Sequence, residues 1–186
     1  MTESRHKSGR VSEPRSPVLL YAMIGLAAIL FGALVLPRFG RGLERKPAPD
    51  FALPVLSGGE PGARVRLSEQ RGKPVLLDFW ASWCGPCKAQ TQVLQAFTNS
   101  PAGKDLVVLG VNVSDDPAAA ERYLAKVKPS WIVLGDPDGT ANQAYEVNEL
   151  PTLVAIDRTG RVFAVRRHFV PEAELSALVA AMASDR

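Results

Sequence analysis

Two cysteines separated by two residues are the only cysteines of this chain, Cys84 and Cys87 in the segment WCGPCK. A pair at this spacing can form a structural disulfide, supply half of a metal site, or carry out thiol–disulfide exchange. A structural zinc site usually requires four ligands. The two histidines are poor candidates, because His6 lies in a polar N-terminal stretch and His168 follows two arginines. We therefore predict that no metal is bound.

The surroundings of the pair favour thiol–disulfide exchange. An apolar run of strand length, residues 73–81, precedes the motif, and a polar, helix-like stretch follows it as far as Phe97. Cys84 would then lie at a helix N-terminus, where free N–H groups and the helix dipole stabilise a thiolate and lower its pKa from about 8.5 toward neutrality. The thiolate is the species that attacks a disulfide. Cys87, one turn further and more buried, would resolve the mixed disulfide.

Asp78 is the lone charged residue of the run PVLLDFWA, six positions before Cys84. A buried carboxyl without a cationic partner has a raised pKa and tends to hold a proton. Below the active-site turn, Asp78 would accept the proton of Cys87 as a general base. The alternative is a carboxylate at a partly solvated strand edge.

Positive charge is concentrated in the N-terminal part of the chain. Residues 1–46 contain eight Lys and Arg against three Glu, whereas residues 47–186 contain fourteen against sixteen Asp and Glu. The larger part therefore has a net charge of −2 (14 minus 16) and offers no basic face to nucleic acid. We expect no nucleic-acid partner.

Residues 18–36 form a run of nineteen residues without a charge. As a helix this run spans about 28 Å, close to the hydrocarbon thickness of a bilayer. The LPRFGRG that ends it is not a convincing signal-cleavage sequence. We predict a disordered cytoplasmic tail over residues 1–17, a transmembrane signal anchor over 18–36 and a linker over 37–49. Positive charges flank the run on both sides, so the charge bias leaves its orientation open.

Residues 50–186 are predicted to form one domain in which strands alternate with helices, as in a layered α/β sheet. The expected strands are residues 50–56, 63–68, 73–81, 105–113 and 131–134, followed by a hairpin over 152–165. The expected helices run from the cysteine motif to residue 97, over 117–127, within 136–147 and over 171–183.

The segment LLDFWASWCGPCK resembles the active-site segment of thioredoxins, including Asp78. The segment ELPTLVAID resembles their second signature, a cis-proline that faces the disulfide, here Pro151. The resemblance implies a thioredoxin-like fold, a central mixed β-sheet flanked by helices. A cis X–Pro bond exposes the preceding backbone to a substrate strand. The residues implied to shape the substrate surface are Trp83, Gly85, Pro86, Leu150, Pro151 and Thr152, whereas Trp80 is assigned to packing.

The chain also resembles a narrower family, the membrane-anchored, extracytoplasmic thioredoxins of the TlpA/ResA/DsbE type. This resemblance covers roughly residues 47–170, with APDFALPVL, VVLGVNVSDD, LGDPDGTANQAYEV and LPTLVAIDRTGRV. It implies an N-terminal β-hairpin extension and an inserted αβ unit between Cys87 and Pro151. Some members have a glutamate near the active site where this chain has Asp115. Asp115 can tune the thiols or meet the substrate, or the pair Asp115-Asp116 can supply a helix N-cap, and the sequence leaves these roles open.

The resemblance implies a single-pass protein of the bacterial cytoplasmic membrane with its catalytic domain in the periplasm. We expect it to be a monomer. Its redox centre would be the Cys84–Cys87 disulfide, without a cofactor. The Gly-Pro dipeptide suggests a reductant, which in an oxidising compartment must be recharged by a membrane electron donor of the DsbD/CcdA type. The implied protein substrate is apocytochrome c, whose haem-binding cysteines must be reduced before haem attachment. Members of that kind often have a less acidic residue where this chain has Asp78.

Other functions fit the motifs less well. A general periplasmic disulfide reductase or isomerase is the nearest alternative. A copper chaperone of thioredoxin fold would need soft ligands and a nearby histidine, for which His168 is the only candidate. A peroxiredoxin-type peroxidase would have a proline and a threonine where this chain has Leu77 and Ala81. A purely structural disulfide leaves Asp78 and Pro151 together unexplained.

Overall fold

The computed structural model describes residues 21, 23–27, 42–60 and 62–184. Residues 1–42 and 43–186 form two separate units. Within the described part, no helix has the length and apolar character needed to cross a bilayer. The predicted tail, most of the predicted anchor and the start of the linker lie outside the described residues, so these predictions stay predictions.

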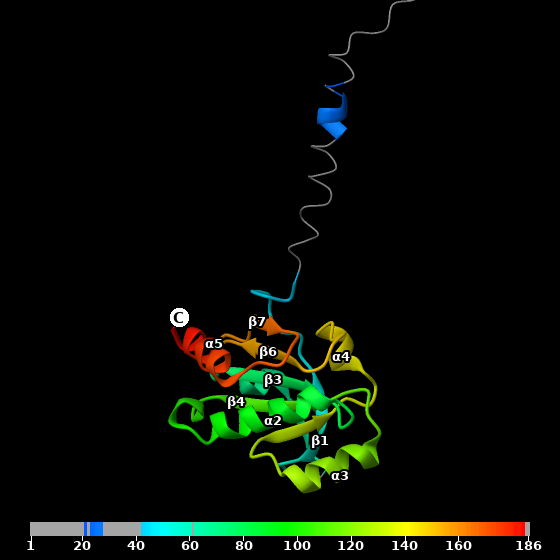
Figure 1. Ribbon diagram of the computed structural model, residues 1–186, viewed down its shortest axis with the longest axis vertical. Coiled ribbons are helices and arrows are strands. Elements are labelled where there is room, and N and C mark those ends of the chain that lie inside the picture. The colour runs from blue at the N-terminus through cyan, green and yellow to red at the C-terminus, as the bar shows by residue number, and fades with distance from the viewer. Residues whose placement is uncertain (1–20, 22, 28–41, 61, 185–186) are drawn as a thin grey trace, which may run out of the picture. The chain divides into compact units, whose positions relative to one another are not determined.

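The second unit is built on a seven-stranded mixed sheet (Figure 1) with the strand order β2-β1-β5-β4-β3-β6-β7. Its strands are β1 Ala52–Ser57, β2 Arg64–Arg66, β3 Val75–Trp80, β4 Val107–Asn112, β5 Ile132–Gly135, β6 Thr152–Ile156 and β7 Val162–Arg166. The three central strands β3, β4 and β5 are parallel, and the other strands run antiparallel to their neighbours.

The helices of this unit are α2 Gly85–Thr98, α3 Pro117–Val127, α4 Thr140–Ala144 and α5 Glu172–Ser184, with short 3-10 turns at Leu67–Gln70 and Pro101–Gly103. The predicted α/β, thioredoxin-like fold is confirmed, and its elements begin and end within a few residues of the expected limits. Strands β1 and β2 form the N-terminal hairpin. Helix α3 and strand β5 lie where the additional αβ unit was expected.

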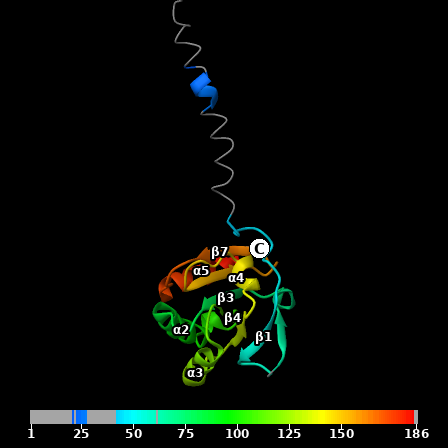
Figure 2. The ribbon, with the colours of Figure 1, turned by 90° about the vertical axis from the view of Figure 1, so that its right-hand side faces the viewer.

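Alternation of side chains along β3 divides the interior into two cores, because successive residues of a strand point to opposite faces. Leu76 and Trp80 belong to a cluster that includes residues of α2, α3 and α5. Leu77 and Phe79 belong to a second cluster with residues of α4 and of the segment before β1. Helices therefore cover both faces of the sheet (Figure 2).

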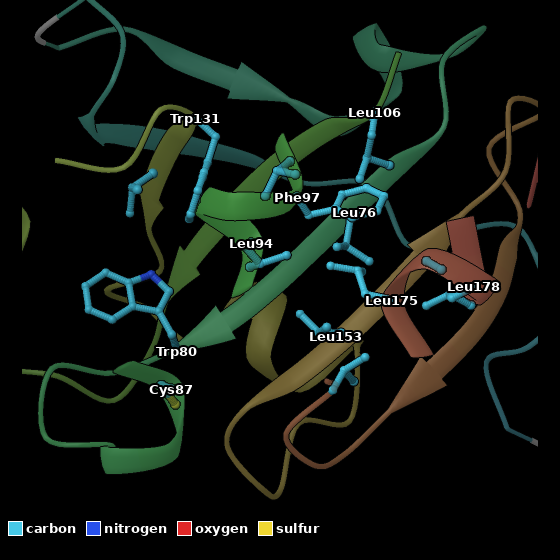
Figure 3. Packing of buried hydrophobic residues seen from close by; sticks show 14 of the residues in the cluster. Leu76, Trp80, Cys87, Leu94, Phe97, Leu106, Trp131, Leu153, Leu175 and Leu178 are labelled. Carbon is cyan, nitrogen blue, oxygen red and sulfur yellow. The ribbon is translucent and has the colours of Figure 1, made fainter. Parts of the chain in front are cut away.

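The first core lies against the cysteine pair. Figure 3 shows Cys87 near Trp80, with Leu94 and Phe97 of α2 further into the same cluster. Burying a large apolar side chain of this kind stabilises a fold by roughly 1.5–3 kcal/mol. Asp78 falls between Leu76 and Trp80 in the alternation, so its carboxyl faces this first core.

Candidate active site

The disulfide is located at the N-terminus of α2. Cys84 and Cys87 are joined by an S–S bond of 1.98 Å. Cys84 is the N-cap residue of the helix, and its Sγ accepts a hydrogen bond from the backbone N–H of Cys87 at 3.1 Å. Pro86 is tolerated in the first turn because N–H groups there have no intrahelical partner. Cys84 therefore has the helix-terminal position predicted from the sequence.

The two buried cysteines are surrounded by exposed residues, over which another protein can reach the disulfide. The side chains of Cys84 and Cys87 are both buried, at 4% and 1% exposure, in the order that was predicted. Gly85 and Pro86 between them are exposed. Trp83 is 63% exposed, and its indole Nε1–H donates to the carbonyl of Ser114 at 2.9 Å. A disulfide partner can therefore approach over Trp83 and the Gly-Pro dipeptide.

A pair of hydrogen bonds fixes the helix that carries the cysteines. The buried side chain of Gln90 in α2 donates through Nε2 to the carbonyl of Val170 at 3.2 Å. Its Oε1 accepts from the backbone N–H of Val170 at 2.7 Å. A buried amide satisfied on both sides avoids the cost of an unpaired polar group. Gln90 thereby holds α2 against the segment that precedes α5.

Asp78 is buried in the middle of the sheet, not at a solvated edge. Its exposure is 2%, and the register places Gly110 of β4 and Leu153 of β6 on either side of it. Among the described residues, its Oδ1 has no hydrogen-bond partner. Burial raises the pKa of Asp78 to about 7. The carboxyl therefore has the burial and the raised pKa that the sequence predicted.

A small cavity lies beside Asp78 on the side of α2 and α3. Its volume is about 10 Å³, near the minimum that holds a water molecule, and its walls include Thr91 and Tyr123. The Thr91 hydroxyl donates to the carbonyl of Cys87 at 3.0 Å, and the Tyr123 hydroxyl donates to Thr91 Oγ1 at 3.3 Å. Thr91 thus contacts Cys87 and also borders the cavity of Asp78.

A surface groove adjoins this cavity. It has a volume of about 630 Å³ between α2 and α3, and Thr91, Tyr123 and Val127 line both spaces. Lys88 and Lys126 are among the residues that line the groove. The side chains of Thr91, Tyr123 and Val127 therefore separate the cavity beside Asp78 from the surface groove.

The predicted proline lies at the same edge of the sheet as the disulfide. The Leu150–Pro151 peptide bond is cis, and β6 begins at the next residue. Because Phe79 pairs with Thr152, Pro151 lies beside the end of β3, from which the chain continues to Cys84. Leu150 is partly buried against both cores. The Thr152 side chain is fully buried, and its hydroxyl donates to the carbonyl of Glu149 at 2.7 Å.

Asp115 does not cap α3. The N-cap residue is Asp116, whose Oδ1 accepts from the backbone N–H of Ala119 at 2.8 Å. Of the Asp115-Asp116 pair, for which an N-cap was one interpretation, Asp116 therefore supplies the cap and Asp115 does not. Its neighbour takes that position because Pro117 begins the helix, so the backbone of residue 116 has the extended conformation of a cap.

The carboxylate of Asp115 binds the turn that leads to the cysteines. It accepts hydrogen bonds from the backbone N–H and the hydroxyl of Ser82. It also accepts from the side-chain amide of Asn112 at 2.8 Å. Ser82 and Asn112 were not singled out from the sequence, although an Asn in the apolar run VVLGVNV was a usable signal.

His168 is engaged at the surface of α5. Its Nδ1 lies 2.9 Å from the carbonyl of Phe169, and its Nε2 lies 3.9 Å from a carboxylate oxygen of Glu174. Within the described residues, no three His, Cys, Asp or Glu side chains are grouped as metal ligands would be. The geometry gives the copper-chaperone hypothesis no support.

The fold and the cysteine pair together define the class of thioredoxin-fold proteins with a redox-active disulfide. The family model described as Redoxin matches residues 43–182, most of the 186 residues. The chain therefore belongs to the Redoxin family.

Two relatives and one solved structure define the likeness further. The thiol-disulfide oxidoreductase ResA of Geobacillus kaustophilus is 33% identical over 115 residues, 62% of this chain and 64% of that protein. The thiol:disulfide interchange protein DsbE of Pseudomonas fluorescens biotype C is 36% identical over 116 residues, 62% of this chain and 61% of that protein. The matches thus span slightly less than two thirds of these relatives.

The solved structure is a crystal structure from Chlorobium tepidum, assigned as a thiol:disulfide interchange protein DsbE. It has 34% sequence identity and a TM-score of 0.67, and the match covers 75% of this chain and 96% of that one. The predicted resemblance to oxidoreductases of the TlpA/ResA/DsbE type is confirmed at the level of the family.

Proposed function

We propose that this protein is an extracytoplasmic, membrane-tethered thiol–disulfide oxidoreductase that reduces disulfides in other proteins, apocytochrome c among them. The observation that carries the proposal is the Cys84–Cys87 disulfide at a helix N-terminus, on the same core as a buried carboxyl, Asp78. The names of the relatives, an oxidoreductase and an interchange protein, support the same activity.

The reduced protein starts the exchange through Cys84. Its thiolate attacks one sulfur of a substrate disulfide, which forms a Cys84–substrate bond and releases the other substrate sulfur as a thiolate. Cys87 then attacks the sulfur of Cys84, closes the disulfide seen in the structure and releases the second substrate thiol. Two electrons pass to the substrate. The free N–H groups at the start of α2 stabilise the attacking thiolate.

Asp78 accepts the proton that Cys87 loses in the second step. A base is most effective when its pKa lies near the working pH, and the pKa of Asp78 is about 7. The cavity beside the carboxyl and the groove beyond Thr91 and Tyr123 provide the side from which protons exchange with solvent.

The substrate lies over the exposed Trp83, Gly85 and Pro86 and along the backbone of Leu150 and Pro151. The buried Thr152 side chain limits this residue to backbone contact. Main-chain pairing gives affinity without demanding one substrate sequence.

The uncharged run over residues 18–36 supports a membrane anchor, and the chemistry supports a location outside the cytoplasm. A reductant in an oxidising compartment has to be reduced again after each turnover. The electron donor is therefore a membrane protein of the DsbD/CcdA type, which regenerates the two thiols. In this proposal the oxidoreductase acts as a monomer.

Capture of the mixed disulfide tests the choice of substrate. A Cys87→Ser variant of the full chain keeps the nucleophile but cannot resolve, so the adduct through Cys84 accumulates. The captured proteins are expected to include ones with a C-x-x-C-H sequence, joined through one of those cysteines. A Cys84→Ser/Cys87→Ser variant is the matched control and should capture nothing. A catch dominated by unrelated proteins with several disulfides would favour the general reductase or isomerase instead.

A further inference from the structure

The active-site turn, residues 81–84, is held by a loop that is more than thirty residues away in the sequence. This loop, residues 113–116, connects β4 to α3. The carboxylate of Asp115 accepts both hydrogen-bond donors of Ser82, the hydroxyl at 2.7 Å and the backbone N–H. The carbonyl of Ser114 accepts the indole N–H of Trp83 at 2.9 Å. Two successive residues before Cys84 are therefore bound to two successive residues of the loop.

The loop is itself held in place for this contact. Asp115 accepts from the Asn112 amide at 2.8 Å and from the backbone N–H of Asp116 at 2.9 Å. Ser114 has φ of 50°, a left-handed conformation that is uncommon for residues other than glycine. Such a conformation persists where the surrounding structure determines it. The loop is therefore a defined support rather than a connection that adapts to the turn.

The turn has little local support of its own. Within it, a backbone hydrogen bond joins the N–H of Cys84 to the carbonyl of Ala81 at 3.1 Å. The hydroxyl and backbone N–H of Ser82 and the indole N–H of Trp83 go to the loop instead. Removing the Asp115 carboxylate would leave two donors of Ser82 without their acceptor, and the turn would be held only by the bonds of Trp83 and Cys84.

We propose that Asp115 is a positioning residue for thiol–disulfide exchange, acting through Ser82 to hold the sulfur of Cys84 in line with the incoming disulfide. The inference rests on the proposed redox function. The physical reason is that exchange requires the attacking sulfur to be aligned with the disulfide, and a displacement of about 1 Å can lower a rate about 100-fold.

A second way for Asp115 to act would be through its charge, and the two ways predict opposite results. A nearby anion disfavours a thiolate, so removing the anion would lower the pKa of Cys84 and speed its reaction at neutral pH. Loss of alignment slows the reaction and leaves the pKa of Cys84 unchanged. The sign of the effect and the pH profile therefore separate positioning from electrostatic tuning.

The test uses the reduced full chain in detergent and oxidised glutathione as the probe, so it does not depend on the natural substrate. Asp115→Ala is expected to lower the second-order rate constant by about 10-fold or more. Ser82→Ala removes one of the two bonds and should have a smaller effect. The double variant should react like Asp115→Ala alone, because the Ser82 hydroxyl then has no partner to lose. Asp116→Asn, which changes the same charge one residue further on, is the control and should react within about twofold of the wild type.

Two further measurements complete the test. The pH midpoint of Cys84 alkylation should be the same in wild type and Asp115→Ala, and amide hydrogen exchange of Ser82 should be faster in the variant. An unchanged rate in Asp115→Ala, or a lowered alkylation midpoint with a faster rate, would overturn the positioning role. If Asp115→Ala does not fold, Ser82→Ala carries the test, and an unchanged rate there overturns it. If the wild type fails to reduce protein disulfides, the proposed function is contradicted. The rates of wild type and variants with oxidised glutathione can still be compared in that case.

Discussion

Asp78 shows how a single charged side chain in a core can serve a reaction. It is flanked on the neighbouring strands by Gly110 and Leu153, neither of which carries a charge. Burial alone therefore sets its pKa at about 7. The same carboxyl that makes folding less favourable at neutral pH can exchange a proton there.

Asp78→Asn is expected to stabilise the oxidised protein in a pH-dependent way. The pKa of Asp78 rises from 3.8 to about 7 on folding, so the folded state binds more protons, and wild-type stability falls as pH increases from about 4 to about 7. The variant lacks this loss. Its advantage should grow across this range to at most about 4 kcal/mol and then stay constant. Denaturant unfolding at several pH values measures it, and parallel pH profiles for the two proteins would contradict the assignment.

The same variant should slow the resolution step. Asn cannot accept the proton of Cys87, so the mixed disulfide persists longer, whereas wild-type resolution slows only as pH falls below about 7 and Asp78 becomes protonated. Rapid-mixing measurements between pH 6 and 9 follow this step. Equal rates for wild type and Asp78→Asn over that range would show that Asp78 is not the base.

Individual residues differed in how far the sequence could predict them. The burial of Asp78 was predicted from one charge in an apolar run of strand length, which favours the core, with a partly solvated strand edge as the alternative. Asp115 could not be assigned, because it and Asp116 both precede a helix and either fits the pattern of an N-cap. Its bonds to Ser82 join residues 33 positions apart, and only the folded chain brings them together.

At the scale of elements, β4 leaves room for the site beside β3. Gly110 is paired with Asp78. A Cβ added at Gly110 would lie 3.3 Å from the indole Nε1 of Trp131 and 3.4 Å from that of Trp80. Two large rings therefore lie next to this backbone, and a side chain at position 110 would displace them.

Gly110→Ala is expected to destabilise the domain by about 1–3 kcal/mol, the usual cost of inserting a methyl group into a well-packed core. The displaced Trp80 should also alter the surroundings of Asp78 and shift the pH dependence of resolution. Thermal or denaturant unfolding measures the first effect. Gly42→Ala is the control, because a Cβ there meets nothing within 4 Å. Equal stability of Gly110→Ala and wild type would mean that the rings of Trp80 and Trp131 leave room for a methyl group at position 110.

The order of strands and helices was predictable because apolar runs, turn residues and helix starts follow one another clearly along residues 50–186. The arrangement of these elements in space was harder to predict. Strand β1 pairs with β5, whose residues come almost eighty positions later, as in the pairing of Val55 with Leu134. The sequences of β1 and β5 do not indicate that these two strands pair, since any exposed strand edge could have accepted β1.

At the scale of the molecule, the sheet brings two segments that are distant in the sequence to the same end of its central strands. The segment from β3 to the first turn of α2 supplies the carboxyl and the disulfide, and the residue just before β6 supplies the cis-proline. The proposed anchor would keep this end near membrane-bound donors and substrates. The charges around residues 18–36 do not determine the orientation of the anchor, whereas the redox chemistry requires the domain to lie outside the cytoplasm.

A topology reporter tests this orientation. Fused after Arg186 of the full chain, a reporter that is active only outside the cytoplasm should be active, and a reporter that is active only inside should not. The reason is that a disulfide reductant with a membrane-bound electron donor is needed where disulfides form. The opposite pattern of activity would place the domain in the cytoplasm and contradict the proposed location.

The most direct test of the central claim is the disulfide-reductase activity of the full chain in detergent, with insulin as the protein disulfide and dithiothreitol as the electron source. Wild type should speed the reduction of insulin well above the rate with dithiothreitol alone, because the thiolate of Cys84 at the helix N-terminus is the attacking group. Cys84→Ser, with its fold verified by circular dichroism, should fall to the uncatalysed rate. Wild-type activity in Cys84→Ser, or no activity in either protein, would contradict the account.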